Sequence, residues 1–267
     1  MSKKRHLNSD KAGFGSTVFG FPYGLERQQD NPSSAQDALA EGAADSEERS
    51  EFKIRLARDA LRLESASILI RRRYEWRGYK TDGAVKPRSD FITLVASIAN
   101  ASVATVSVGL DFGGGLLAEE LYPDEVQVLR GRGYRLCEFV KLAVDTNSRS
   151  NAILGAIFHV AVIYAKRIHN RSHVLVEVNP RHAKFYEVLL GLKVIGEART
   201  NSRVNAPAVL MLLDLEYAGE QISMFRSRST LRRRERSIYT FAFSEEEEES
   251  IYRRLIGTMQ LQPQQPT

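Results

Sequence analysis

The sequence contains a single cysteine, Cys137, among its 267 residues. One cysteine excludes an internal disulfide and is consistent with a reducing compartment, so we expect a cytoplasmic protein. Cys137 falls within a predicted central strand and has no obvious base beside it in the sequence. We therefore interpret it as a packed, inert thiol rather than as a nucleophile.

Long apolar runs and targeting signals are also missing. The longest apolar run, Ala152 to Ala165, includes His159 and is too short to cross a bilayer. The first eleven residues, MSKKRHLNSDK, have no hydrophobic core and do not form a secretory signal. The sequence therefore predicts no transmembrane segment.

Signatures of metal, nucleotide and nucleic-acid binding are absent as well. The histidines do not follow a metal spacing such as His-Glu-x-x-His, so we predict no metal. Gly113 to Gly115 form a triple glycine without the Lys-Ser/Thr of a phosphate loop, and we interpret them as a gate over substrate. The net charge is +5, but without a helix-turn-helix, zinc-finger or RNP pattern we predict no nucleic-acid partner.

What the chain does have is an ordinary globular composition, with 43% hydrophobic and 27% charged residues. Its length suits one domain with additions. Residues 1–50, rich in Ser, Asp, Gln, Gly and Ala, are expected to be a disordered leader. Residues 51–215 form the main domain, and residues 216–267 a C-terminal helical extension with a frayed tail. Ser244 and Glu247 form a capping box for a helix in that extension.

The stretch from Gly133 to Leu192 organises the chain. It predicts a strand at 135–144, a polar turn, an amphipathic helix at 151–169 and a strand at 173–178. Asn179 and Pro180 then suit the cap and first position of another helix. A βαβ crossover makes the two strands parallel, and ligands of such sheets bind at the carboxyl ends of the strands. The free amides of the helix after the turn suit a phosphate.

Other elements follow from the same patterns. We expect strands at 52–57, 91–99 and 102–110, the last two joined as a hairpin about Asn100-Ala101. A helix is predicted from Asp59 to about Arg77 and a short one over 122–129. Strands at 193–198 and 208–215, joined by a polar loop at 199–207, complete the main domain.

Two segments carry a resemblance to known families. The stretch from Asn179 to Leu192, with Tyr186 seven residues after the Asn and Gly191-Leu192 after the helix, resembles the signature of GCN5-related N-acyltransferases. The stretch from Cys137 to Asp145 resembles the Glu-x-Ser-Arg-Phe-Ala-Val-Asp strand of acyl-homoserine-lactone (autoinducer) synthases. Over about residues 52–215 the chain is most similar to the long-chain N-acyl amino acid synthases. The resemblance implies the α+β N-acyltransferase fold, a twisted mixed sheet between helices.

Two departures from these families bear on the substrates. The acetyl-coenzyme-A turn, Gln/Arg-x-x-Gly-x-Gly/Ala, is replaced by Arg149-Ser-Asn-Ala-Ile-Leu154, so both small positions differ. The difference suits acyl carrier protein, whose pantetheine bears one phosphate, better than coenzyme A. Lys141 stands where the autoinducer synthases have Arg and lacks the planar fork of a guanidinium, which disfavours lactone formation.

The resemblance also implies roles for individual residues. Glu138 is the candidate general base, or a strand carboxylate paired with a cation. Tyr186 is the candidate acid for the leaving sulfur, or a packed aromatic residue. Asn179 holds pantetheine or caps its helix. Lys141 is a candidate for the acceptor carboxylate. The remaining candidates are backbone amides at Val140, Leu142, Ala143 and Val144 for the thioester and pantetheine, Asn147, Arg149 and Asn151 for the phosphate, and Arg73 and Tyr79 for the substrate pocket.

The function implied is N-acyl transfer from long-chain acyl-phosphopantetheine on acyl carrier protein, or from acyl-CoA, to the amino group of a small-molecule amino acid, with no permanently bound cofactor. Acyl carrier proteins are acidic, and the basic groups Arg149, Lys166, Arg167 and Arg171 flank the predicted entrance. Acetyl-CoA-dependent N-acetylation and autoinducer synthesis remain alternatives. A non-catalytic acyl-binding or interaction module is a further one.

Overall fold

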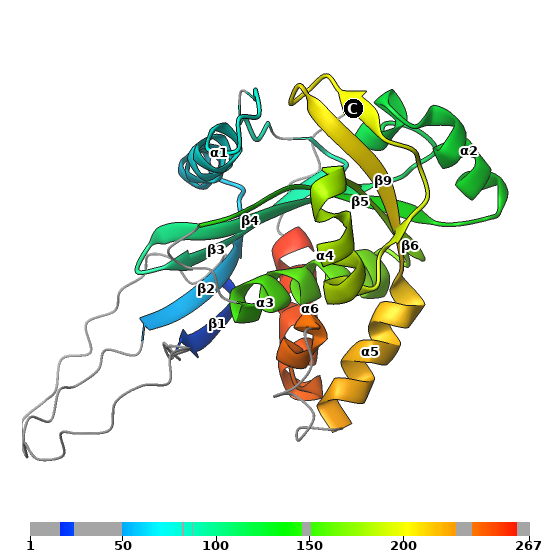
Figure 1. The fold of residues 1–267 in the computed structure, drawn as a ribbon. Helices are drawn as coiled ribbons and strands as arrows, with labels where there is room; N and C mark the ends of the chain where they lie inside the picture. The colour runs from blue at the N-terminus through cyan, green and yellow to red at the C-terminus, as the bar shows by residue number, and fades with distance from the viewer. Residues whose placement is uncertain are drawn as a thin grey trace, which may run out of the picture.

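The computed structural model describes residues 17–23, 50–81, 83–86, 88–145, 151–227 and 237–260. Its centre is a twisted mixed sheet of nine strands among these residues, ordered β1-β2-β3-β4-β5-β6-β9-β7, with β8 pairing to β9 (Figure 1). The strands are β1 (Thr17–Tyr23), β2 (Ser50–Leu56), β3 (Phe91–Ile98), β4 (Ala101–Leu110), β5 (Leu136–Val144), β6 (His173–Val178), β7 (Lys193–Val194), β8 (Arg199–Asn201) and β9 (Ala206–Asp214).

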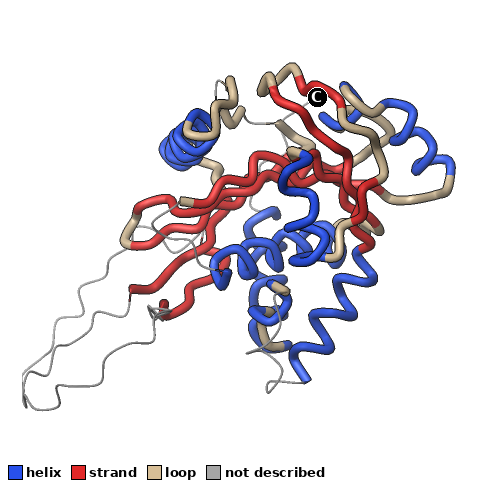
Figure 2. The backbone as a smooth tube through the Cα atoms, in the orientation of Figure 1, coloured by secondary structure: helices blue, strands red, loops and turns tan. Residues whose placement is uncertain are grey.

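Helices cover both faces of the sheet (Figure 2). One face carries α1 and α2, and the other carries α3, α5 and α6. The helices are α1 (Ala60–Glu75), α2 (Pro123–Gly131), α3 (Asn151–Val162), α4 (Pro180–Leu190), α5 (Leu215–Ser227) and α6 (Glu245–Gln260), with short turns η2 (Leu117–Glu120), η3 (Ile163–Ile168) and η5 (Ile238–Phe241). A twisted mixed sheet between helices is the α+β architecture expected from the sequence.

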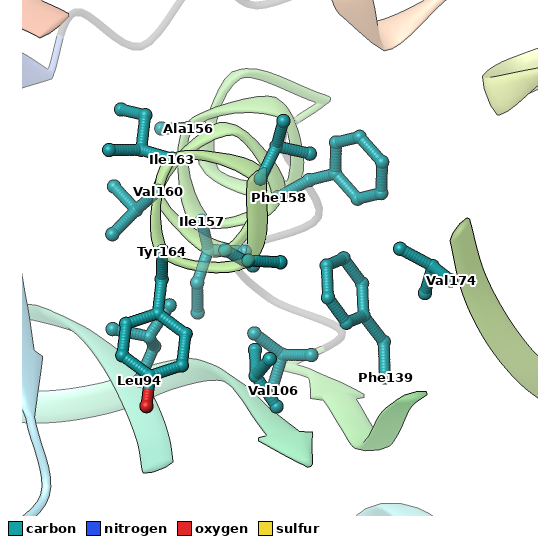
Figure 3. Close-up of a cluster of buried hydrophobic side chains, with 14 of the residues drawn as sticks. Leu94, Val106, Phe139, Ala156, Ile157, Phe158, Val160, Ile163, Tyr164 and Val174 are labelled. Carbon is teal, nitrogen blue, oxygen red and sulfur yellow. The ribbon is translucent and has the colours of Figure 1, made fainter. Parts of the chain in front are cut away.

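The main hydrophobic core lies between α3 and the sheet. Figure 3 shows Ile157 of α3 and Tyr164 of η3 pointing toward the strand residues Leu94 and Val106, with Phe158 beside Phe139. The continuous segment from Asn151 to Ile168 is apolar enough and long enough to cross a membrane, but two thirds of it is buried within the protein. Its position against the sheet identifies it as the core helix of the domain.

The one parallel pair of the sheet is short. Strands β5 and β6 are in register only from Leu136–His173 to Glu138–Leu175. Beyond that point β5 continues for six residues beside β4, while β6 continues beside β9. The βαβ pattern predicted a parallel pair, and the register confirms it.

A bulge in β5 coincides with the separation. The register against β4 shifts between Thr105 and Ser107, and Lys141 has a φ of +55°. Such a bulge breaks the regular ladder of hydrogen bonds and turns backbone groups away from the neighbouring strand. Because a non-glycine residue rarely adopts this conformation, the strain marks a site that the surrounding packing holds in place.

Several local predictions are confirmed. Asp59 caps α1 by accepting a hydrogen bond from the Arg62 amide (2.9 Å), and Asn179 caps α4. The hairpin of β3 and β4 forms, but its turn is at Ala99-Asn100, one residue before the predicted Asn100-Ala101; both φ angles there are positive as a type I′ turn requires. Cys137 is buried, and burial raises the pKa of its thiol.

Other local predictions are wrong. Thr17–Tyr23, assigned to a disordered leader, pairs with β2 as an edge strand; the rest of residues 1–49 lies outside the described part of the chain. The strand expected at 193–198 is reduced to two residues, and β8 forms within the predicted loop at 199–207. Neither β7 nor β8 alternates polar and apolar residues, so their strand conformation comes from pairing with β9 rather than from local pattern.

The C-terminal extension packs against α3 through a charged cluster. Glu248 of α6 accepts from Arg167 (3.0 Å) and from Arg226, and lies 3.2 Å from His159 Nε2. The Phe243 amide donates to His159 Nδ1 (3.1 Å), so this buried imidazole is bonded at both nitrogens. The predicted capping box of Ser244 and Glu247 is present.

Candidate active site

A cavity of about 540 Å³ opens where β5 and β6 separate. Its walls come from the bulge of β5, the end of β6, the start of α4 and the segment between α1 and β3. The hairpin of β8 and β9 closes it, and the Lys80 amide donates to the Val204 carbonyl (3.0 Å) across this closure. Its volume lies within the range of about 300–1,000 Å³ typical of small-ligand sites.

Small polar residues form the floor of the cavity. The hydroxyls of Thr93 and Ser107 on adjacent strands are hydrogen-bonded to each other (2.7 Å) and buried. The Phe91 ring lies over Gly109, where a Cβ atom would come within 2.4 Å of the ring. The absence of a side chain at Gly109 therefore lets the Phe91 ring lie against the strand.

The backbone candidates divide at the bulge. Val140 and Leu142 line the cavity, whereas Ala143 packs in a cluster with Leu69 and Ile70 of α1. Val144 pairs with Ala104 of β4 and does not line the cavity. The amides available to a ligand at this strand are therefore those near the bulge, rather than the whole run predicted from the sequence.

Glu138 lies beside the cavity rather than on its wall. Its side chain is 1% exposed, and its two carboxylate oxygens accept the amides of Leu117 (2.7 Å) and Ala118 (3.0 Å) at the start of η2. Burial raises the pKa of Glu138 to about 7, against the lowering effect of these amides. Among the described residues Leu117 lines the cavity and Glu138 does not, so Glu138 positions this part of the wall.

Glu177, near the end of β6, does line the cavity. One carboxylate oxygen accepts a hydrogen bond from the Arg203 guanidinium. The other, Oε1, is buried and makes no hydrogen bond of ordinary geometry with the described residues. Burial raises the pKa of Glu177 to about 7; the Arg203 charge and the Asn201 amide lower it, and Glu120 adds to the rise.

Tyr186 and Asn179 both line the cavity, Asn179 as the N-cap of α4 and Tyr186 about two turns into this helix. Burial raises the pKa of the Tyr186 hydroxyl, so this group stays protonated well above neutral pH. The Asn179 side chain accepts the Arg181 amide (3.2 Å), which makes it a helix cap that also faces the cavity. The sequence left these two interpretations of Asn179 open, and the structure supports both.

Cations surround the mouth. Tyr79 lines the cavity and accepts a hydrogen bond from Arg181 (3.2 Å). Lys141 also lines it and donates to the Ala84 carbonyl. The positively charged residues among those lining it are Arg77, Lys86, Arg88, Lys141 and Arg203, whereas Glu177 is the only acid of this lining within the described part of the chain.

The remaining sequence candidates lie elsewhere. Arg73 is buried against Trp76, with its guanidinium 4.9 Å from the ring centre, and does not line the cavity. Asn151 is exposed at the first turn of α3, while Asn147 and Arg149 lie outside the described residues. Of the cations expected at the entrance, Lys166 and Arg167 instead pair with Glu216, Glu248 and Glu249 of the extension.

Sequence reasoning missed Glu177 and Arg203. A local signal existed for Glu177, because the strand HVLVEV places one acid among apolar residues, two positions before Asn179. Arg203 gave no such signal. It reaches the site only through the β8–β9 hairpin, which the sequence did not predict.

Comparisons with known proteins identify the family of the chain. The family model of N-acyl amino acid synthase FeeM matches residues 65–214, more than half of the chain. The chain belongs to this family. A solved FeeM, an N-acyl amino acid synthase from uncultured soil microbes, is 26% identical, with a TM-score of 0.56 over 67% of this chain and 95% of that one. No curated protein matches the sequence.

Two further solved structures share lower similarity. A putative N-acetyltransferase from Lactobacillus plantarum is 16% identical (TM-score 0.46, 61% of this chain and 98% of that one). The AHL synthase LasI is 12% identical (TM-score 0.45, 62% and 91%). The FeeM family match establishes an acyltransferase. The matched residues 65–214 include both strands that flank the cavity and exclude the C-terminal extension.

The cavity contains groups whose chemistry suits acyl transfer. Backbone amides at a strained bulge are fixed donors for a developing oxyanion. Tyr186 is a protonated hydroxyl in the lining, and Glu177 is a carboxyl group that changes charge near neutral pH. The arrangement can hold a thioester carbonyl, accept a proton from an amine and return one to a thiolate.

Proposed function

We propose that the protein transfers a long-chain fatty acyl group from a thioester on acyl carrier protein to the amino group of an amino acid. The observation that carries this proposal is the cavity at the point where β5 and β6 separate. An extended pantetheine arm can complete the hydrogen bonds of two strands that have lost each other as partners. Acyl-CoA is the second donor with the same reactive arm.

Two features support a carrier protein over coenzyme A. The turn Arg149-Ser-Asn-Ala-Ile-Leu154 has neither glycine of the acetyl-coenzyme-A pattern, although residues 146–150 lie outside the described part of the chain. In addition, the rim is cationic: Arg77 and Lys86 are exposed, and Arg181 follows Asn179. A positive rim attracts an acidic carrier protein and accelerates its association at low ionic strength.

The same charges favour an amino acid as acceptor. Lys141 and Arg203 lie on the cavity wall and lend it a positive potential that suits a carboxylate. An amino acid carries its amine beside such a carboxylate, whereas a polyamine would add positive charge to a positive site. The acceptor amine then lies near Glu177, the single acid among the described lining residues.

A fatty acyl chain suits the apolar part of the cavity. Ile70 and Val85 form the side toward α1, and Phe91 lies on β3 opposite. Burying methylene groups there contributes about 0.8 kcal/mol each, so an acyl chain that enters this part binds more tightly than an acetyl group.

In the proposed reaction the chain's own groups act in sequence. Amides at the bulge near Val140 and Leu142 hold the thioester oxygen, where they stabilise the negative charge that forms as the amine adds. Tyr186 supplies a proton to the sulfur as the carbon–sulfur bond breaks.

The test is a transfer assay with purified protein, palmitoyl carrier protein and a mixture of the twenty amino acids. We expect release of the carrier thiol and a new N-palmitoyl amino acid detected by mass spectrometry. Palmitoyl-CoA, acetyl-CoA and the carrier with homoserine derivatives are parallel arms. Faster product formation with acetyl-CoA would identify an acetyltransferase, a lactone would identify an autoinducer synthase, and binding without turnover would identify an acyl-binding module.

A further inference from the structure

Glu138 and Glu177 lie on the same side of neighbouring strands but in different surroundings. Glu138 is opposite Leu175 in the last parallel pair, and Glu177 follows Leu175 by two positions, on the side of β6 from which Leu175 contacts the α2 core. Side chains two apart share a face of a strand. Glu177 therefore lies past the last pair, where β5 no longer covers it.

The hydrogen bonds of the two carboxylates differ in the same way. Both oxygens of Glu138 accept backbone amides of η2, and the residue is 1% exposed and does not line the cavity. Glu177 has one oxygen bound by Arg203. Its Oε1 is buried, and the nearby Asn201 side chain lowers the pKa of the carboxyl without a hydrogen bond of ordinary geometry to this oxygen. A buried carboxylate oxygen that lacks a well-formed hydrogen bond destabilises the folded protein unless a ligand donates one.

We propose that Glu177 is the general base that takes the proton of the acceptor amine, a role that rests on the amine-acylating function proposed above. The neutral amine nitrogen forms its bond to the thioester carbon, and the carbonyl electrons move to oxygen. The nitrogen then gives its proton to Glu177 Oε1. The carbonyl re-forms as the carbon–sulfur bond breaks, and the leaving thiolate takes a proton from Tyr186. A proton returned from Glu177 to the tyrosinate restores both groups.

The pKa of Glu177 suits this task. A base with a pKa of about 7 is ionised in half of the molecules at pH 7 and is still basic enough to accept a proton. Burial raises the pKa of Glu177, and the charge of Arg203 lowers it and so favours the ionised form. Glu120, which pairs with the same guanidinium, raises the pKa of Glu177. The other titratable groups whose charges interact with Glu177 are Glu138 on β5, Tyr74 on α1 and Tyr122 before α2.

The decisive experiment compares three single variants by the pH dependence of kcat and KM. The substrates are palmitoyl carrier protein and the amino acid that the wild-type protein acylates fastest. The variants are Glu177→Gln, Glu138→Gln and Glu120→Gln, and thermal unfolding is recorded for each. Glu120 is the matched control, because it pairs with Arg203 but its side chain is 53% exposed and it does not line the cavity.

We expect Glu177→Gln to lower kcat by on the order of 10²–10⁴-fold with little change in KM for the donor, and to remove the fall in rate below about pH 7. Glu177→Asp should restore part of the rate together with the acidic fall. Glu120→Gln should keep the maximal kcat, but its kcat should begin to fall at a lower pH than in the wild-type protein. The reason is that loss of the neighbouring negative charge lowers the pKa of Glu177. Glu138→Gln should retain the decrease in kcat at acidic pH and should unfold at a lower temperature than the wild-type protein.

An active wild-type protein whose Glu177→Gln variant keeps its kcat and its acidic fall would overturn the proposal. If the fall disappears in Glu138→Gln instead, Glu138 is the base. If Glu177→Gln does not fold, the pH–rate profile of Glu120→Gln tests the proposal instead. A profile identical to that of the wild-type protein would contradict Glu177 as the base. If the protein acts only on a donor other than acyl carrier protein, the proposed donor is wrong, and the same three pH profiles recorded with that donor test Glu177 as the base. If no donor supports transfer, both the proposed function and the proposed role of Glu177 are overturned.

Discussion

The two faces of the central sheet are built from the same strands yet serve opposite purposes. Toward α3, β3 and β4 present large apolar side chains such as Leu94, Val106 and Val108, all buried in one core. Toward α1, the alternate positions beside the cavity include the small or polar residues Thr93, Ser107 and Gly109. Because side chains alternate along a strand, one sequence specifies both a dry face that stabilises the fold and a recessed face that holds the cavity.

The largest expected effect lies on the dry face. Ile157→Ala deletes a fully buried side chain of α3 and should cost about 2–5 kcal/mol of unfolding free energy, because a cavity replaces packed methyl groups. Urea denaturation measures the loss, and Ile68→Ala, at a position that is 55% exposed on α1, is the control expected to change it by less than about 0.5 kcal/mol. Equal losses in the two variants would contradict the distinction between the faces.

On the recessed face the larger effects should appear in rate rather than stability. Tyr186→Phe should lower kcat on the order of 10²-fold, or about 2.7 kcal/mol of activation free energy, because the leaving sulfur loses its proton donor. Steady-state kinetics with palmitoyl carrier protein measures this loss. Tyr252→Phe, on α6 outside the cavity, serves as the control, and a wild-type rate in Tyr186→Phe would exclude the tyrosine as the acid.

The sequence predicted the parts of this arrangement that depend on local pattern. Asn179 before Pro180 marks the start of α4, and Tyr186 falls two turns later on the face that lines the cavity. The polar turn between a strand and a long helix predicted the parallel pair. These features depend on residues close together in the chain, where capping and periodicity act directly.

The difference between Glu138 and Glu177 was not predictable in this way. Glu138 is removed from the cavity by amides of Leu117 and Ala118, about twenty positions away in the sequence. Glu177 is placed in it by a hairpin that includes Arg203 and forms only against β9. Local pattern marks each of them as an acid within an apolar strand, but long-range packing decides which carboxylate faces a ligand.

The junction between the dry face and the C-terminal extension has a pH-dependent stability. Burial would raise the pKa of the Glu248 carboxyl, but hydrogen bonds from His159 and Arg226 outweigh it and lower the pKa to about 2. Its stabilising contribution is therefore complete above the ordinary pKa of 4.5 and is lost as the pH falls toward 2. Glu248→Gln should lose about 2 kcal/mol at pH 7.

Urea denaturation at several pH values measures this contribution. The difference between the wild-type protein and Glu248→Gln should narrow as the pH falls from about 4.5, and Glu245→Gln in the same helix is the exposed control. A difference that stays constant with pH would show that the carboxylate charge contributes nothing.

The smallest expected effect concerns the floor of the cavity. Thr93→Val leaves the Ser107 hydroxyl without its partner and should cost about 1 kcal/mol of unfolding free energy. Adding Ser107→Ala removes the unsatisfied group, so the double variant should recover most of that loss. A double-mutant cycle by chemical denaturation measures the coupling, and strictly additive losses would contradict a direct hydrogen bond.

The most direct measurement is a crystal structure with a palmitoyl-pantetheine analogue in which the thioester sulfur is replaced by a methylene group. The pantetheine arm should lie between Phe139–Leu142 of β5 and Val176–Asn179 of β6, with its carbonyl oxygen at the amides of the bulge and its tail under α1. An analogue bound elsewhere on the protein, with the space between the two strands left unchanged, would contradict the account.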